Sequence, residues 1–209
     1  VGDAASFVDP LSSFGVKKAL ASAWLAAIVV HSALTDAAAA SPALDLFEER
    51  ERSMYEHLRH ASAALSREAA GAHETPFWSA RGDAALTAPT GEWDVSELRA
   101  DSRVHAAFEE LKRRESIRLR PADSLEVVTR PVVRGRRVVL EDHLSGPAVP
   151  TAVRFCRNVD LVVLARLAPG FDQVPDLFDA YNRGAPPAPL PDFLGALSTL
   201  VGLGMLTLT

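Results

Sequence analysis

Cysteine is nearly absent from the chain: Cys156 is the single one among 209 residues. No disulfide can therefore form within the chain, which favours a reducing compartment, and we expect a cytoplasmic protein. Histidine and cysteine show no metal-ligand spacing, since His57 and His60 stand three apart on an expected helix without acidic or thiol partners; no metal site is expected. An excess of positive charge is also lacking, and the net charge of −5 excludes an electrostatically driven nucleic-acid binder.

A dinucleotide-binding Gly-x-Gly-x-x-Gly unit is lacking as well. The one Gly-x-Gly pair, Gly202-Leu203-Gly204, has no third glycine and no following helix. A convincing membrane span is not expected, because the apolar stretch 19–30 is alanine-rich and shorter than the roughly 20 residues that a span needs. Lys17-Lys18 before this stretch imitates the start of a signal peptide, but the segment 1–16 upstream of them argues against one.

The most informative segment of the chain is its first fifteen residues, Val1-Gly2-Asp3-Ala4-Ala5-Ser6-Phe7-Val8-Asp9-Pro10-Leu11-Ser12-Ser13-Phe14-Gly15. Val1-Gly2-Asp3 has the pattern of the end of a buried strand, where Gly2 lets a ligand or another backbone approach closely. Asp3 would then lie at a carboxyl strand end, where open α/β sheets bind ligands. Ser13, Phe14 and Gly15 lead into a helix whose first N–H groups form an anion site.

This pattern resembles the GDAA…DPL…G segment near the end of the FAD-binding domain in flavin-dependent monooxygenases of the p-hydroxybenzoate hydroxylase fold. The sequence from Phe7 to Ser13 is most similar to that of the tryptophan-halogenase-like branch. The resemblance covers Val1 to Thr35 well, with only general similarity beyond. In that family the pyrophosphate-binding glycines, the catalytic lysine and the Trp-x-Trp-x-Ile-Pro motif lie upstream of the GDAA segment, so this chain is expected to be the C-terminal part of such an enzyme, without identifiable catalytic residues.

The resemblance implies FAD as the cofactor and assigns roles to several residues. Asp3, next to Gly2, would accept hydrogen bonds from the ribityl hydroxyls, and Pro10 would stiffen the turn. After Ser13, the N–H groups of Phe14 and Gly15 would face the flavin pyrimidine edge and, in halogenases, lie near the halide. A small aromatic or electron-rich molecule would be the substrate, and a flavin reductase would be the partner that supplies reduced flavin.

Periodicity indicates helices along most of the remaining chain. Apolar residues at Val16, Leu20, Ala23, Ala27, Val30 and Leu34 follow one helical face, and further apolar residues predict a core helix buried nearly all round. A second helix is expected over 43–70, with Ser41 as N-cap and Pro42 at its first position. Phe77-Trp78 after it fits either plain core or the wall of a substrate cavity.

The middle of the chain adds one helix and one hairpin. Asp94 and Glu97 form a plausible helix start ahead of an apolar stripe that ends in Lys112-Arg113-Arg114. The segments 125–133 and 137–144, joined by Arg134-Gly135, predict a β-hairpin whose first strand is an edge strand because it contains Pro131.

Three short helices, 160–167, 174–181 and 190–203, followed by an apolar strand at 205–208, predict a small winged-helix-like module. Its third helix has no Arg or Lys, so we expect it to pack on the rest of the enzyme or on another subunit rather than to read DNA.

The expected fold is mostly α with minor β (α+β): the C-terminal edge of an α/β FAD domain (1–36), a helical region with a hairpin (37–146) and the C-terminal module (147–209). The expected function is that of an FAD-dependent monooxygenase or halogenase-like oxidoreductase. A geranylgeranyl-reductase-like flavoprotein and a non-enzymatic helical binding module stay open as alternatives.

Overall fold

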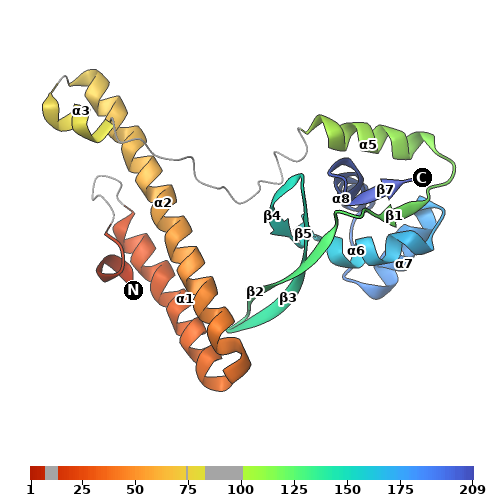
Figure 1. The fold of residues 1–209 in the computed structure, drawn as a ribbon, viewed down its shortest axis with the longest axis horizontal. Coiled ribbons are helices and arrows are strands. Elements are labelled where there is room, and N and C mark those ends of the chain that lie inside the picture. The colour runs from red at the N-terminus through yellow and green to blue at the C-terminus, as the bar shows by residue number, and fades with distance from the viewer. Residues whose placement is uncertain (8–13, 74, 83–100) are drawn as a thin grey trace. The chain divides into compact units, whose positions relative to one another are not determined.

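The computed structural model describes residues 1–7, 14–73, 75–82 and 101–209. These residues are mostly helical, with small antiparallel sheets, so the α+β class expected from the sequence is confirmed (Figure 1). The expected helix start at Asp94 and Glu97 lies outside the described residues.

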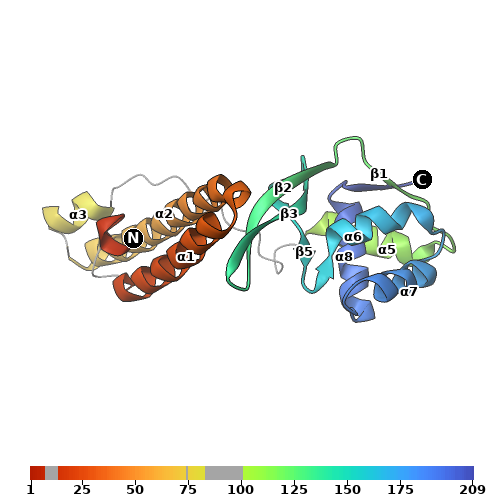
Figure 2. The same ribbon diagram turned by 90° about the horizontal axis from the view of Figure 1, so that it is seen from below.

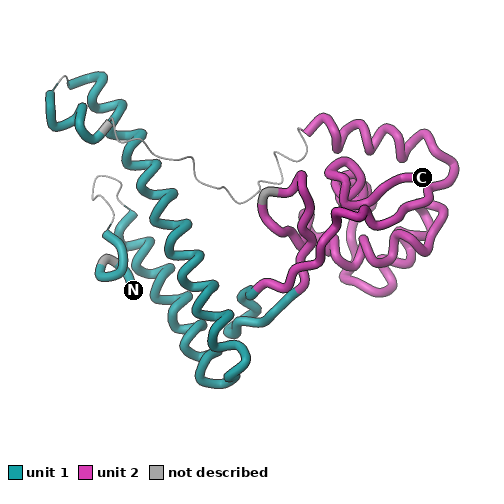
Figure 3. The backbone as a smooth tube through the Cα atoms, viewed as in Figure 1, with its two compact units in different colours: residues 1–90, 131–141 teal, residues 91–130, 142–209 magenta. Residues whose placement is uncertain are grey.

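The chain forms two compact units, which Figure 3 distinguishes by colour. Unit 1 contains residues 1–90 and 131–141, and unit 2 contains residues 91–130 and 142–209. The tip of one hairpin therefore belongs to unit 1, although its base belongs to unit 2. The three-part division at residues 36 and 146 stays a prediction.

Unit 1 is built from helices, together with the hairpin tip. Its described elements are η1 (Gly2–Ala4), α1 (Gly15–Thr35), η3 (Ala37–Ala39), α2 (Ala40–Ala72) and α3 (Pro76–Gly82). Helices α1 and α2 pack side by side, joined by η3, and α3 packs on α2 (Figures 1 and 2).

The start of α2 differs from the expected cap at Ser41. The carboxylate of Asp36 accepts the N–H of Ala38 at 3.0 Å and caps η3, which continues directly into α2. Ser41 and Pro42 lie inside the first turn of the helix, where the missing N–H of proline costs nothing.

The expectation that α1 is buried nearly all round is wrong. Its predicted apolar face is exposed along its whole length, with exposed fractions of 77% at Val16, 67% at Leu20 and 82% at Leu34. The buried residues of α1 are Lys18, Ser22, Ile28, Val29 and Ser32. The physical reason is that, among the described residues, α2, η1, η3 and the hairpin tip cover only one side of the helix.

By length and composition, α1 is also apolar enough to cross a membrane. An 18-residue window has a mean hydropathy of 1.4, and 33% of it is buried within the structure. A core helix and a signal sequence meet the same criterion.

The core of unit 1 joins α1, α2 and the hairpin tip. Its buried members are Ile28, Val29, Ala43, Leu46 and Val138. The side-chain hydroxyl of Ser32 accepts the N–H of Val138 at 2.8 Å, across 106 positions of sequence. This hydrogen bond gives the hairpin tip a polar attachment inside an apolar core.

Unit 2 contains the C-terminal helices and the small sheets. Its described elements are α5 (Ser102–Arg113), β1 (Leu119–Pro121), parts of β2 (Glu126–Arg134) and β3 (Arg137–Gly146), β4 (Val149–Val153), β5 (Phe155–Cys156), β6 (Val159–Asp160), α6 (Leu161–Leu167), η4 (Ala168–Gly170), α7 (Val174–Gly184), α8 (Leu190–Gly202) and β7 (Leu206–Leu208). The three short helices and the final strand expected at the C-terminus are confirmed. Strand β7 pairs antiparallel with β1, with Leu208 opposite Leu119.

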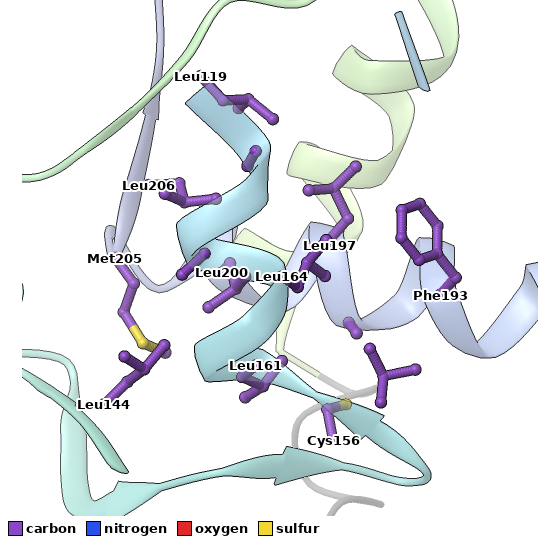
Figure 4. Close-up of a cluster of buried hydrophobic side chains, with 14 of the residues drawn as sticks. Leu119, Leu144, Cys156, Leu161, Leu164, Phe193, Leu197, Leu200, Met205 and Leu206 are labelled. Atoms are coloured by element: carbon purple, nitrogen blue, oxygen red, sulfur yellow. The ribbon is translucent and has the colours of Figure 1, made fainter. Parts of the chain in front are cut away.

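The core of unit 2 is centred on α8, which packs against α5 and α6. Phe193, Leu197 and Leu200 are fully buried, and the ring of Phe193 lies 5.8 Å from that of Tyr181. Figure 4 shows Leu197 and Leu200 of α8 beside Leu164 of α6, with Leu144 of β3 facing Met205. The apolar third helix therefore packs on α5, which lies outside the predicted C-terminal module, and on α6 within that module.

The predicted hairpin is confirmed as β2 and β3, which form a three-stranded sheet in the order β2-β3-β4. Pro131 lies in β2, an edge strand, as its missing N–H requires. Strand β4 was not expected, because the boundary between the helical region and the C-terminal module was placed between residues 146 and 147. Leu144 nevertheless pairs with Val153 and Gly146 with Val149, across a short turn at 147–148.

The expected strand at Val1-Gly2-Asp3 is wrong: these residues begin a 3₁₀ turn, η1. Gly2 has φ of +64°, in the left-handed region, which a continuing strand cannot adopt. Val1 is 55% exposed, and no described strand pairs with it. Without a neighbouring strand, the backbone groups of these residues bond locally and to α1 instead.

Candidate functional site

The segment that resembles a flavin site lies against the first turns of α1. The carbonyl of Gly2 accepts the N–H groups of Ala5 at 3.1 Å and Ser6 at 3.2 Å, which closes a tight turn. The side-chain hydroxyl of Ser22 accepts the N–H of Gly2 at 3.4 Å. The turn that carries Asp3 is thereby tied to α1 at its first residue.

Gly2 is buried, and α1 is the neighbour that approaches it. A Cβ at this position would lie 3.5 Å from the Cβ of Ala19, in ordinary contact, so the left-handed φ of Gly2 is the stronger requirement for glycine. Since its N–H and carbonyl already have partners, Gly2 shapes the turn. Its assignment to the cofactor stays a prediction.

The N-terminus of α1 is the helix end that the sequence predicts as an anion site. Helix α1 begins at Gly15 with Phe14 as N-cap, and the side chain of Phe14 makes no capping hydrogen bond. The first N–H groups of a helix lack intrahelical acceptors and carry the positive end of its dipole. Phe14 is 40% exposed.

The remaining predicted cofactor residues are outside what the structure describes. Pro10 and Ser13 belong to the segment 8–13, and of Asp3 only the backbone is described. The cofactor roles of Asp3, Pro10, Ser13, Phe14 and Gly15 therefore stay predictions.

A pocket of about 580 Å³ lies beside the same turn, between residues 5–7 and α2. Its lining residues are Ala5, Ser6, Phe7, Glu51, Arg52 and Tyr55. Two buried atoms of its lining residues, the hydroxyl of Ser6 and one carboxylate oxygen of Glu51, have no hydrogen-bond partner among the described residues. Sequence reasoning did not find this pocket, because it joins residues about 45 positions apart whose side chains follow no motif.

For Phe77 and Trp78 the sequence left two interpretations, plain core or the wall of a substrate cavity. The first is wrong, and the second stays a prediction. They pack edge to face with ring centroids 5.0 Å apart, but Phe77 is 53% exposed, so they are not plain core. The guanidinium of Arg81 lies 3.9 Å from the centre of the Phe77 ring. Neither aromatic lines the pocket beside Ser6.

The titratable groups with shifted pKa values lie in unit 2 and have structural causes. A hydrogen bond from Arg166 lowers the pKa of Asp142, and burial raises the pKa of the Cys156 thiol and of Tyr181. No group of three His, Cys, Asp or Glu side chains able to hold a metal ion occurs in the described part of the chain. Hydrogen bonding and burial therefore account for these shifts.

Lys18 is the residue that sequence reasoning missed at this site. It was grouped with Lys17 as a positive run, yet Lys18 is 2% exposed and its ammonium bonds to the turn, while Lys17 is exposed. The available signal was the spacing of Lys18, Ser22 and Ser32, which places three polar residues on one face of an otherwise apolar helix.

Comparison with known proteins yields one likeness, at the level of the fold. No family model matches the chain, and no curated protein matches it. Among solved structures, the α+β arrangement is similar to that of a peptidyl tryptophan dihydroxylase. That protein is QhpG, described as essential for tryptophylquinone cofactor biogenesis; the TM-score is 0.55 and the sequence identity 21%. The match covers 98% of this chain but 40% of that chain.

Proposed function

We propose that the chain is part of a longer FAD-dependent oxidoreductase, a monooxygenase or halogenase-like enzyme that acts on an aromatic or electron-rich small molecule. The proposal rests on a sequence pattern combined with a similarity of fold. The GDAA…DPL…G pattern stands at the start of α1, and nearly the whole chain has the fold of part of a dihydroxylase.

In this proposal the chain supplies binding and electrostatics. When bound, FAD supplies the redox chemistry and the activation of oxygen. Asp3 holds the ribityl chain, Pro10 shapes the turn, and Ser13 leads into the helix. The N–H groups of Phe14 and Gly15 stabilise negative charge on reduced flavin, or hold a halide.

The dihydroxylase of similar fold acts on peptidyl tryptophan, which makes an indole ring the first substrate to test. Hydroxylation and halogenation are then distinguished by product mass after incubation with labelled dioxygen or with bromide. Because such an enzyme needs a source of reduced flavin, a flavin reductase is the proposed partner. A cytoplasmic location is proposed from the single cysteine.

The first test is Asp3→Ala in the full-length enzyme, followed by measurement of the FAD that is retained on purification. We expect most of the flavin to be lost, because the ribityl hydroxyls lose their charged acceptor. Undiminished flavin content would rule out the ribityl role of Asp3. A longer gene product without an upstream Gly-x-Gly-x-x-Gly unit would favour the non-enzymatic helical module instead.

A further inference from the structure

Lys18 is an unusual residue for the buried side of a helix. Its side chain is 2% exposed, whereas lysine is almost never fully buried unless partners satisfy its ammonium. The neighbouring Lys17 is exposed and lies near the Phe14 ring, 5.9 Å from its centroid. Two adjacent lysines therefore have opposite environments.

The ammonium of Lys18 bonds to the backbone of the turn. It donates to the carbonyl of Gly2 at 3.1 Å and to the carbonyl of Ser6 at 2.5 Å. Ser22, one helical turn further on, accepts the N–H of Gly2. Two side chains of α1 thus hold both ends of the segment 2–6.

The turn needs this support. Its only regular element is η1, three residues long, and so short a 3₁₀ helix does not form stably by itself. The Gly2 carbonyl, which also accepts two N–H groups of the turn, is shared with Lys18. Charge-assisted hydrogen bonds of this kind are about twice as strong as neutral ones.

We propose that Lys18 is a positioning residue: its ammonium fixes the Gly2–Ser6 turn in the conformation in which Asp3 is presented to the cofactor. The inference rests on the proposed function for the cofactor, while the fixing of the turn stands on the hydrogen bonds alone.

The first measurement is amide hydrogen exchange in the full-length protein that contains this chain, comparing Lys18→Met with the matched control Lys17→Met. Methionine keeps the length of the side chain and removes the ammonium. We expect exchange at the Ala5 and Ser6 amides to become about tenfold faster in Lys18→Met, with α1 and α2 unchanged. Ser22→Ala should produce a smaller increase at the same residues.

Unchanged exchange at residues 5 and 6 in Lys18→Met would overturn the proposal. Faster exchange throughout α1 and α2 would also overturn it, because Lys18 would then be a general core residue. Equal effects of Lys17→Met and Lys18→Met would also overturn the proposal, since of these two lysines Lys18 is the one that bonds to the turn.

The second measurement is the dissociation constant for FAD in the full-length enzyme with the same substitutions. We expect Lys18→Met to weaken FAD binding about tenfold without lowering the thermal midpoint, and Lys17→Met to leave binding unchanged. If Asp3→Ala loses FAD but Lys18→Met does not, the positioning role is wrong and the proposed function stands. If neither variant affects FAD, the proposed function fails, and the exchange data still decide whether Lys18 fixes the turn.

Discussion

Asp101 shows how one charged residue both caps a helix and sets a pH dependence. Its carboxylate accepts the N–H of Arg103 at 2.8 Å and is paired with the Arg103 guanidinium at 2.6 Å. The side-chain hydrogen bond from Arg103 is the main cause that lowers the pKa of Asp101 from 3.8 to about 2. The cap is therefore complete above the ordinary pKa and is lost as the pH falls through about 2.

We predict that the side-chain carboxyl of Asp101, followed by NMR, titrates with a midpoint near 2 in the unmodified chain and moves toward 3.8 in Arg103→Ala. Lys112→Ala, at the other end of α5, is the control and should leave the midpoint unchanged. A midpoint that stays near 2 in Arg103→Ala would show that the backbone N–H groups alone hold the carboxylate.

Glycine decides the packing of two helices in unit 2. A Cβ at Gly202 would lie 2.7 Å from the Cα of Val104 and 2.8 Å from the backbone carbonyl of Arg103, closer than real Cβ contacts. Helix α8 therefore approaches the backbone of α5 at a point where only glycine fits. At Gly195, on the same helix, an added Cβ would meet nothing within 4 Å.

We predict that Gly202→Ala lowers the free energy of unfolding by about 1–3 kcal/mol, because α5 and α8 must move apart. Gly195→Ala should instead raise it by about 0.5–1 kcal/mol, since alanine favours the helix. Urea unfolding followed by circular dichroism measures both changes. Equal effects of the two substitutions would mean that the contact between α5 and α8 does not limit stability.

The helices and strands were predicted from the sequence more successfully than the contacts that each of them makes with other elements. The period of Val16, Leu20 and Leu34 correctly predicted the helix and its apolar face. It did not predict that this face is exposed, because periodicity identifies a face without identifying what covers it. The strand at Val1 failed for a related reason: a strand depends on hydrogen bonds to a neighbour that the local sequence does not show.

The candidate site was predictable in part. Residue type and order correctly predicted that a helix begins near Gly15, because helix-start signals are local. Gly2 was expected to end a strand and instead begins a turn, and the cofactor roles of Gly2, Phe14 and Gly15 stay predictions. Lys18 was not found, since its partners are backbone carbonyls 12 and 16 positions away and carbonyls have no sequence signal. The pocket beside Ser6 was missed because it depends on how the first residues pack on α2.

At the scale of the whole molecule, the exposed apolar face of α1 is the feature that favours self-association. It presents Val16, Leu20, Trp24, Val30 and Leu34 to solvent, each more than half exposed. Contiguous apolar surface of this kind marks an interaction site or a region of aggregation. The 209-residue chain is therefore expected to self-associate, to bind FAD weakly or not at all, and to show no turnover.

We predict that replacing both Leu20 and Leu34 with glutamate shifts the chain from large species toward monomer in analytical ultracentrifugation, with the helical signal unchanged. The control is Val29→Glu on the buried side of α1, which should unfold unit 1 because it buries an unpaired charge. A soluble monomer of the unmodified chain that copurifies with stoichiometric FAD would contradict the prediction.

The position of the hairpin tip in the sequence determines when the core of unit 1 can be completed during protein synthesis. The core of this unit is completed by Val138, whose N–H bonds to Ser32, so residues separated by 106 positions must meet. A ribosome that adds about 5–20 residues per second releases α1 and α2 well before the tip is made. For several seconds the nascent helices α1 and α2 lack the hairpin tip that completes their core. A chaperone that binds apolar helices can bind them during that interval.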